Sequence, residues 1–245
     1  MMCKTILVTG SSKGLGLAIA KDLSKHGFSV VLNARDEKSV DKALTYLNQD
    51  NPHYAFCYDL TKQDSVGKLD TYLQKEKIQI DGIVHNLGGK IANDMQPLHV
   101  KTLHKSMRLN LEVAIEINNY LIPQMIQRGG GAIVHIGSSS GLSGNAAPAY
   151  AISKGALNTY VKNSARYYAK DGVCICSVVP GILDHEGSEW DKKSKLEPKK
   201  YEDRKMNMPL QRFGKPEEIA PFVTAIFTSK SMQVAGSILY FEGGI

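Results

Sequence analysis

The sequence predicts an α/β fold in which a parallel, seven-stranded sheet is covered by helices on both faces, in one doubly wound domain. Two observations lead to this prediction. Short runs rich in apolar and β-branched residues alternate with longer segments whose apolar residues recur at helical spacing. Such alternation is typical of parallel sheets, because their strands are buried on both faces. No repeat, linker or composition break divides the 245 residues, so we expect a single domain over residues 1–245.

The order of the expected elements follows from these runs. Strands are expected at residues 5–8, 28–32, 54–58, 82–85, 132–136, 173–179 and around 237–241. Helices are expected at residues 15–26, 40–47, 66–73, 103–128, 149–170 and 216–227. Pro123 is expected to kink the long fourth helix. In such a sheet the ligand lies beyond the carboxyl ends of the strands, where the strand order reverses.

Composition argues against several classes of protein. The net charge of +6 is compatible with nucleic-acid binding, but the main lysine cluster, in residues 192–200, is interrupted by Glu197 and flanked by Asp191, Glu202 and Asp203. We therefore expect a solvated surface and an anionic ligand, and no nucleic-acid partner. The four cysteines lack metal-ligand spacing, and Cys174 and Cys176 are expected to be reduced thiols on one face of a strand. The apolar run after Lys4 is too short for a signal peptide and no apolar run is long enough to span a membrane, so we expect a cytoplasmic protein.

A glycine-rich loop follows the first expected strand and opens the first expected helix. In this loop Gly10 permits a tight turn, Gly14 lets backbone N–H groups approach a diphosphate, and Gly16 allows close packing of helix and sheet. The alternative is a plain strand-to-helix turn. A P-loop is excluded because no Gly-Lys-Ser/Thr ends the segment. The loop predicts a dinucleotide site.

The residue after the second expected strand distinguishes the two nicotinamide cofactors. An acidic residue there would bind the ribose 2′-hydroxyl of NAD, whereas this sequence has Arg35. A guanidinium pairs well with the 2′-phosphate of NADP, and Lys13 is a second candidate for that phosphate. The alternative is that both cations are merely solvated. We therefore predict NADPH/NADP⁺ as the cofactor.

The segment TGSSKGLG at residues 9–16 resembles the TGxxxGxG signature of the short-chain dehydrogenases/reductases, a Rossmann-fold family. The resemblance continues to the C-terminus, and its general pattern is most similar to that of 3-oxoacyl-acyl-carrier-protein reductases. It implies a set of cofactor-binding residues along the whole chain. These are Gly10, Ser12, Lys13, Gly14, Leu15, Gly16, Arg35, Asp59, Leu60, Asn86, Gly88, Tyr150, Lys154, Pro180 and Gly181.

Tyr150 and Lys154 are the central catalytic candidates. They are four residues apart in an expected helix, so their side chains lie on one face. A free tyrosine has a pKa of about 10, and a neighbouring ammonium group stabilises the phenolate. General acid–base catalysis requires such tuning. We therefore expect Lys154 to lower the pKa of Tyr150, which acts as the general acid.

Two further catalytic residues follow from the resemblance. Ser138, at the end of the fifth expected strand, matches the family's catalytic serine, with Ser139 and Ser140 as alternatives. Asn110 matches the family's helix asparagine and is implied to support a water-borne proton relay to Lys154. The implied reaction is reduction of a ketone by NADPH: Tyr150 gives its proton to the developing oxyanion and Ser138 donates a hydrogen bond to it.

The substrate stays open at this level. A 3-oxoacyl thioester would be presented by an acidic acyl carrier protein, and such relatives dock it with basic residues. At the matching positions this sequence has Gly129 and Asp171, with Arg128 and Lys170 as neighbouring substitutes. This makes a carrier protein a weak candidate and keeps a polyol, sugar-derived or other small ketone substrate open.

The charged segment 182–207 is predicted to be a lid over the substrate. Many relatives have a threonine after Pro-Gly that contacts the nicotinamide, whereas this sequence has His185 near that position. His185 is either a ligand contact or an exposed loop residue. Trp190, the single tryptophan of the chain, is either a wall of the substrate site or a packing residue.

Relatives form dimers or tetramers through their two long helices, so the resemblance implies a homo-oligomer, with a homotetramer as the expected form. Leu157, Val161, Ala165 and Tyr168 are compatible with such an interface and equally with core packing.

Two other functions compete with the reductase. The segment GSSSG at residues 137–141 matches the GxSxG elbow of serine hydrolases, with Ser139 as the nucleophile and Asp184 and His185 following in order. The elbow requires a helix directly after the serine, whereas residues 142–148 look loop-like. The second competitor is a non-catalytic NADPH-binding regulator. It would have no need for Ser138, Tyr150, Lys154 and Asn110 together.

Overall fold

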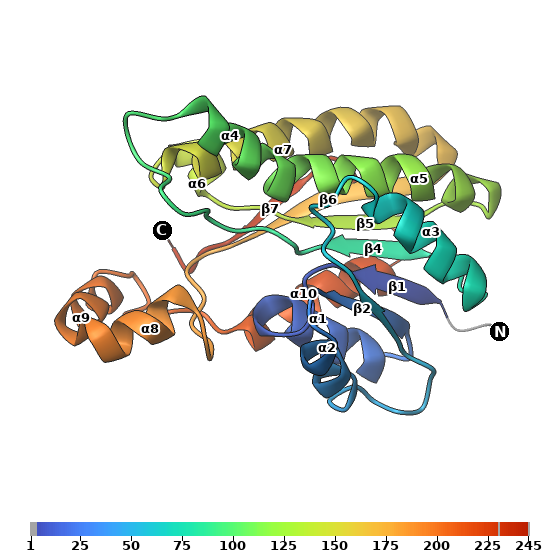
Figure 1. Ribbon diagram of the computed structural model, residues 1–245, viewed down its shortest axis with the longest axis horizontal. Coiled ribbons are helices and arrows are strands. Elements are labelled where there is room, and N and C mark those ends of the chain that lie inside the picture. Colours follow the sequence, from blue (N-terminus) through green and yellow to red (C-terminus); the bar gives the residue numbers. More distant parts are fainter. Residues whose placement is uncertain (1–3, 230, 245) are drawn as a thin grey trace.

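The computed structural model describes residues 4–229 and 231–244 (Figure 1). Its centre is a parallel sheet of seven strands in the order β3-β2-β1-β4-β5-β6-β7. The strands are β1 (Thr5–Val8), β2 (Ser29–Ala34), β3 (Tyr54–Cys57), β4 (Gly82–His85), β5 (Gly131–Ile136), β6 (Val173–Pro180) and β7 (Ile238–Phe241). The strand order reverses between β1 and β4, so the loops after these strands form the switch point at which a ligand is expected. The predicted fold class is confirmed.

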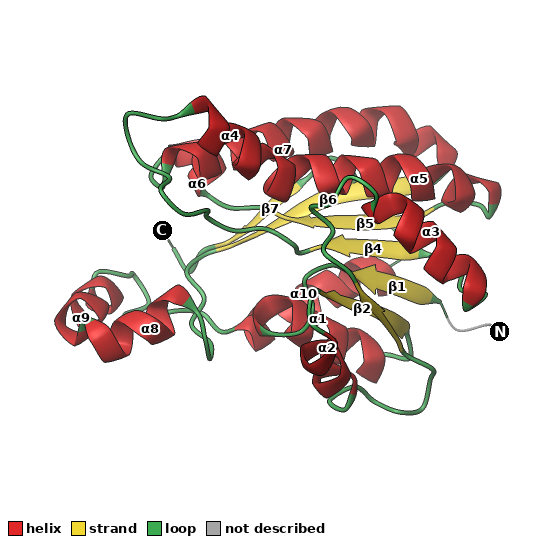
Figure 2. Cartoon of the chain, viewed as in Figure 1, coloured by secondary structure: helices red, strands yellow, loops and turns green. Residues whose placement is uncertain are grey.

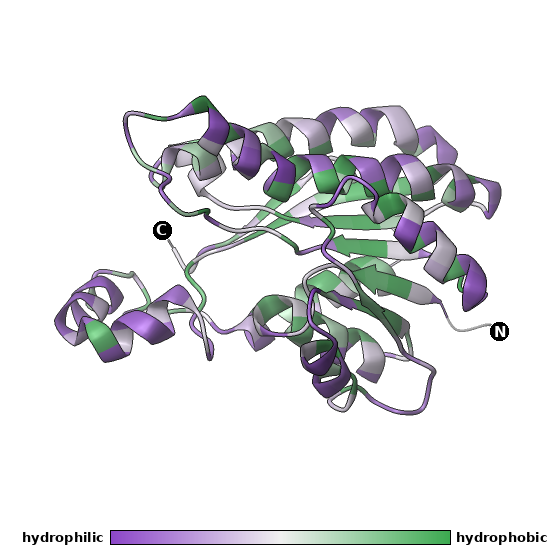
Figure 3. Ribbon diagram, in the orientation of Figure 1, coloured by the Kyte–Doolittle hydropathy of each residue, from purple (hydrophilic) through white to green (hydrophobic). Residues whose placement is uncertain are grey.

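Helices cover both faces of the sheet (Figure 2). One layer contains α1 (Gly14–Lys25), α2 (Glu37–Leu44) and α10 (Pro216–Thr228). The other contains α3 (Ser65–Lys75), α5 (Val113–Gln127) and α7 (Pro148–Tyr168). The strands between the layers are apolar, as their colour in Figure 3 shows, and each layer encloses its own hydrophobic core. No described helix combines the length and apolar character that crossing a bilayer requires.

The long helix predicted at residues 103–128 is divided. Helix α4 (Val100–Met107) leads through one π-helical turn, Arg108–Glu112, into α5, which continues through Pro123. The break therefore lies at the π turn and not at the proline. Such turns are frequent at functional sites, and this one contains Asn110.

The predicted lid segment contains two helices, α8 (Glu189–Leu196) and α9 (Pro198–Met206), which project from the body of the molecule (Figure 1). They are hydrophilic nearly all round (Figure 3), and ion pairs three or four residues apart support them. Trp190 and Tyr201 pack on Phe213 at ring-centroid distances of 4.8 and 5.2 Å. This aromatic cluster attaches the two helices to the rest of the chain.

The cysteines of β6 and three apolar residues of α7 are buried. Cys174 and Cys176 are free and buried on β6, while Cys3 lies outside the described residues. On α7, Leu157, Val161 and Ala165 face the core, with exposures of 2%, 0% and 3%. These three residues therefore serve core packing, and the exposed apolar side chains of α7 are Ile152 and Tyr167.

Candidate active site

Tyr150 lies in the first turn of α7, and a distant carboxylate holds its backbone. Asp94, in the loop after β4, accepts hydrogen bonds from the N–H groups of Ala149 (2.7 Å) and Tyr150 (2.9 Å). These donors have no partner within the helix, and Pro148 removes one more unpaired donor from the helix start. Asp94 has no recognisable signal in the sequence, because it caps a helix 55 residues away.

Lys154 follows one turn later and is buried, with 4% of its surface exposed. Its ammonium group donates to the carbonyl of Ile136 at 2.7 Å and lies 5.9 Å from the centre of the Tyr150 ring. Burial lowers the pKa of Lys154 to about 8, because the charged form loses hydration. The Lys154 ammonium group therefore loses its proton only slightly above neutral pH.

Ser138 approaches Tyr150 from the end of β5. Burial raises the pKa of Tyr150, and a hydrogen bond with the Ser138 hydroxyl lowers it in part. Burial outweighs this hydrogen bond, so the pKa of Tyr150 is raised overall and not lowered as the sequence predicts, and the ammonium group of Lys154 donates to the carbonyl of Ile136. The hydroxyl of Ser138 also accepts from the N–H of Ser140.

The segment that carries Ser138 packs tightly on α7. A Cβ at Gly141 would lie 2.5 Å from the carbonyl carbon of Lys154, so only glycine permits this contact. The residues that follow form the one-turn helix α6 (Ser140–Ser143), which ends at Gly144 in the left-handed conformation. The prediction of a loop at residues 142–148 is therefore wrong for Leu142 and Ser143, which belong to this helix.

Asn110 is buried below the loop that follows β4. Its amide forms a reciprocal pair with Gly89, accepting from the N–H (2.8 Å) and donating to the carbonyl (3.0 Å), and it also donates to the carbonyl of Ser106. A Cβ at Gly88 would lie 2.8 Å from the Asn110 oxygen and 3.3 Å from the Lys154 nitrogen. Asn110 and Lys154 thus approach the same backbone atom, the Cα of Gly88. Tyr150 contacts both Ser138 and Lys154, so the four residues that the sequence predicts lie together.

A groove of about 410 Å³ lies at the switch point between β1 and β4. It contains eight of the predicted cofactor-binding residues: Gly10, Ser12, Lys13, Arg35, Asp59, Leu60, Asn86 and Gly88. Gly14, Leu15 and Gly16 form the adjoining start of α1. Pro180 and Gly181 lie elsewhere, on the wall of a second cavity.

The glycine loop has the geometry that its sequence predicts. Gly10 and Gly14 adopt φ angles of +60° and +57°, which L side chains disfavour. A Cβ at Gly16 would lie 2.5 Å from both the Asn86 amide and the Gly10 carbonyl, so this glycine allows α1 to approach the sheet. A turn of this form, at a helix N-terminus beside exposed cations, fits an anionic dinucleotide.

The charges along the groove also fit such a ligand. Arg35 follows β2 directly and Lys13 precedes α1, and both are exposed. Burial favours the neutral form of Asp59, but hydrogen bonds from Thr61 and the nearby charge of Arg35 keep its pKa below the usual value. Asp59 is therefore an ionised acceptor in the groove.

The second cavity, of about 510 Å³, lies beside Ser138 and extends below the lid helices. Pro180, Gly181 and Trp190 contribute to its wall. Trp190 thus lines the cavity and packs on Phe213 at the same time. Lys90 borders both this cavity and the cofactor groove. No pattern in the sequence indicates this position of Lys90.

His185 lies against the glycine loop. A Cβ at Gly14 would be 2.7 Å from the Nε2 atom of His185, so the imidazole packs directly on Gly14. Its Nδ1 atom lies 3.0 Å from the carbonyl of Glu186. The residue is therefore placed next to the cofactor groove and not in an isolated exposed loop.

This placement argues against the serine hydrolase. The Asp184 carboxylate accepts hydrogen bonds from Tyr201 and Ser188, and the imidazole of His185 contacts Gly14. Asp184 and His185 are thus engaged away from Ser139. Among the described residues, no group of three or more His, Cys, Asp or Glu side chains is arranged to hold a metal ion.

The family model of the short chain dehydrogenases matches residues 4–195. The chain belongs to this family. A curated relative, the 3-oxoacyl-[acyl-carrier-protein] reductase of Buchnera aphidicola, is 29% identical over 243 residues, which are 99% of this chain and 97% of the relative. Carbonyl reductase family member 4 of Xenopus laevis is 30% identical over 247 residues, covering 100% of this chain and 98% of the relative.

Among solved structures, L-sorbose reductase from Gluconobacter frateurii, complexed with NADPH and L-sorbose, superposes with a TM-score of 0.91 at 25% identity. The match covers 99% of this chain and 96% of that chain. The protein is thus a short-chain oxidoreductase that acts on CH–OH and C=O groups.

Proposed function

We propose that this protein reduces a ketone to a secondary alcohol with NADPH, and that Tyr150 is the general acid. One observation carries the proposal. The phenol of Tyr150 shares a hydrogen bond with Ser138 beside a cavity, while the buried ammonium group of Lys154 lies below the same ring. This combination provides two donors for a developing oxyanion and a cation behind them.

Each residue has a distinct task in the proposed reaction. When bound in the groove, NADPH supplies the hydride that reduces the carbonyl carbon and leaves as NADP⁺. Tyr150 gives its phenolic proton to the carbonyl oxygen, and Ser138 donates a hydrogen bond to the same oxygen. Lys154 stabilises the tyrosinate that remains until solvent returns the proton. Asn110 holds the Gly88–Gly89 backbone beside Lys154 and supports the return of the proton.

The preference for NADPH rests on charge. Arg35 and Lys13 border the groove near the end of β2, where a 2′-phosphate would lie, and guanidinium binds phosphate in a bidentate manner. The solved L-sorbose reductase is complexed with NADPH, which supports the same assignment.

Two further parts of the proposal concern the lid and the assembly. Residues 182–207 act as the lid over the substrate. Pairing of subunits through α5 and α7 makes the protein a homo-oligomer.

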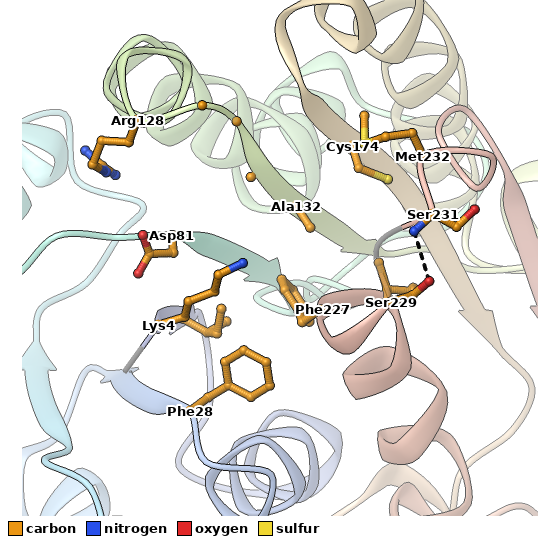
Figure 4. Close-up of a pocket in the computed structure, with 15 residues that line it drawn as sticks. Lys4, Phe28, Asp81, Arg128, Ala132, Cys174, Phe227, Ser229, Ser231 and Met232 are labelled. Atoms are coloured by element: carbon orange, nitrogen blue, oxygen red, sulfur yellow. Dashed lines mark hydrogen bonds between the residues drawn. The ribbon is translucent and has the colours of Figure 1, made fainter. Parts of the chain in front are cut away.

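Two substrate classes follow from the relatives: a 3-oxoacyl thioester and a sugar-derived ketone. The position of Arg128 excludes presentation of the first to the active site of the same subunit. Figure 4 shows Arg128 beside a cavity with Lys4 and Asp81, at the amino ends of the strands, and it donates to the carbonyl of Ile80 at 2.6 Å. Ser138 lies at the opposite end, so a carrier protein docked on Arg128 would not reach Tyr150 of the same subunit.

The test is NADPH oxidation against a panel of acetoacetyl thioesters, diketones, quinones and keto-sugars. We expect Tyr150→Phe to lower kcat at least about 100-fold and to leave NADPH binding, measured by its fluorescence, unchanged. Arg35→Ala should raise the KM for NADPH and leave that for NADH unchanged. NADPH binding without turnover of any ketone would indicate the regulator, and labelling of Ser139 by a fluorophosphonate would indicate the hydrolase.

A further inference from the structure

The cavity beside Ser138 has an apolar side and a polar side. Hydroxyl and amide groups lie along one side of it, on the segment between β5 and α7. They belong to Ser138, Ser139, Ser140, Ser143 and Asn145. A substrate that carries several hydroxyl groups would find partners there, whereas a long alkyl chain would leave these groups unpaired at a cost in free energy.

Three cations from separate segments border the same cavity: Lys90 after β4, Lys193 on α8 and Arg204 on α9. One carboxylate, Glu189, pairs with both lysines, at 3.2 Å from Lys90 and 2.6 Å from Lys193. The hydrogen bond from Lys193 and the charge of Lys90 keep the pKa of Glu189 below its usual value. Glu189 is therefore charged. Its single negative charge does not balance the three cations, so the group as a whole keeps a net positive charge.

Arg204 is the cation that is available to a ligand. It forms no ion pair with any residue that the structure describes, and its side chain is exposed at the cavity. A guanidinium group binds a carboxylate through two parallel hydrogen bonds, which orient the ligand as well as attract it. The only other carboxylate on the cavity wall within the described chain is Glu242, so the wall carries three cations and two anions.

We propose that the substrate is a small polyhydroxylated keto acid. Its carboxylate binds Arg204, and its hydroxyl groups bind the hydroxyl and amide groups of the segment between β5 and α7. Its ketone then reaches Ser138 and Tyr150. The cavity volume of about 510 Å³ suits a molecule of this size. This inference rests on the proposed reductase function, and it narrows the substrate to an anionic member of the sugar-derived class.

The kinetic test compares a keto-hexonic acid with a neutral keto-hexose of the same carbon number. We expect Arg204→Gln to lower kcat/KM for the acid by about 10- to 100-fold, through KM, and to change the value for the neutral sugar less than about twofold. Glu189→Gln should have the opposite effect on the acid, because it frees two lysines. Lys199→Gln, on the same helix but away from the cavity wall, is the matched control and should leave both values unchanged.

A binding test needs no turnover. Trp190 is the single tryptophan of the chain and lines the cavity, so its fluorescence reports occupancy. Titration with the hexonic acid product should change this fluorescence in the wild type and in Lys199→Gln, but not in Arg204→Gln at the same concentrations. Equal losses for acid and sugar in Arg204→Gln would overturn the inference, as would reduction of neutral ketones or thioesters without reduction of the acid. If no ketone is reduced and Tyr150→Phe changes nothing, the proposed function fails as well.

Discussion

At the scale of single residues, Lys154 makes the reaction sensitive to alkaline pH. Burial lowers its pKa to about 8, while burial raises the pKa of Tyr150 above its usual value. As the pH rises, Lys154 therefore loses its charge before Tyr150 loses its proton. We predict that kcat/KM for ketone reduction is constant from pH 6.5 to 7.5 and falls about tenfold per pH unit well above pH 8.

The measurement is a pH profile of kcat/KM, with circular dichroism to show that the protein stays folded at pH 9. A Lys154→Arg variant, which keeps its charge at every pH, should show a flatter alkaline limb whatever its absolute rate. A wild-type limb that begins only near pH 10 would contradict the role assigned to Lys154.

The sequence revealed residues that are related by local geometry and missed those that are not. Tyr150 and Lys154 could be paired because four residues of helix place them on one face. The direction of the Tyr150 pKa could not be predicted, because it depends on burial by segments that are distant in sequence. Lys90 and Arg204 were missed for the same reason: a lone cation has no local pattern, and only the fold brings it to a cavity.

At the scale of elements, the start of α7 depends on Asp94. An acceptor at a helix N-terminus typically contributes about 1 kcal/mol to stability. Here the same carboxylate also fixes the backbone of Tyr150, at 2.9 Å from its N–H group. We predict that Asp94→Ala lowers the free energy of unfolding by about 1–2 kcal/mol and lowers kcat about tenfold or more, because the phenol loses its fixed position.

The control for this prediction is Asp36→Ala. Asp36 caps α2 by accepting from the N–H of Ser39 at 2.8 Å, so its loss should cost similar stability with kcat unchanged at saturating cofactor. Asp94→Asn retains one acceptor and should lie between the wild type and Asp94→Ala. Equal losses of kcat in Asp94→Ala and Asp36→Ala would show that the effect is one of general stability.

The elements that could be predicted are those with a clear period. All seven strands appear in the sequence as apolar runs and the helices against the sheet as apolar residues at helical spacing. The structure differs by a few residues at their ends and by the division of the helix expected at residues 103–128. Helices α8 and α9 could not be recognised by an apolar stripe, because ion pairs and one aromatic cluster support them instead. The π turn around Asn110 likewise has no signal in hydrophobic periodicity.

At the scale of the whole molecule, two histidines are enclosed in the core between the sheet and α5 and α7. The rings of His85 on β4 and His135 on β5 stack at 4.6 Å, and both lie beside Asn118. Their exposures are 5% and 0%, and the Nδ1 atom of His135 has no hydrogen-bond partner in the described part of the chain. Burial lowers the pKa of His85 to about 4 and holds that of His135 well below its usual value.

These shifts predict loss of stability in mild acid. An unfolded histidine binds a proton near pH 6.5, whereas folded His85 does so only near pH 4. Between these values the unfolded state binds more protons, so the free energy of unfolding falls as the pH falls. From pH 7.5 to pH 5 each buried histidine should cost about 2 kcal/mol, and carboxylates add little because they titrate at lower pH.

Urea denaturation at pH 7.5, 6.5, 5.5 and 5 measures this slope. The double variant His85→Asn, His135→Asn should show a slope smaller by nearly two protons, even if it is less stable at pH 7.5, because asparagine does not titrate. A His26→Asn variant, whose side chain is exposed, is the matched control and should retain the wild-type slope. A wild-type free energy of unfolding that is constant from pH 7.5 to 5 would show that the pair takes up protons within the folded protein, and that the core around Asn118 accommodates a charged imidazole.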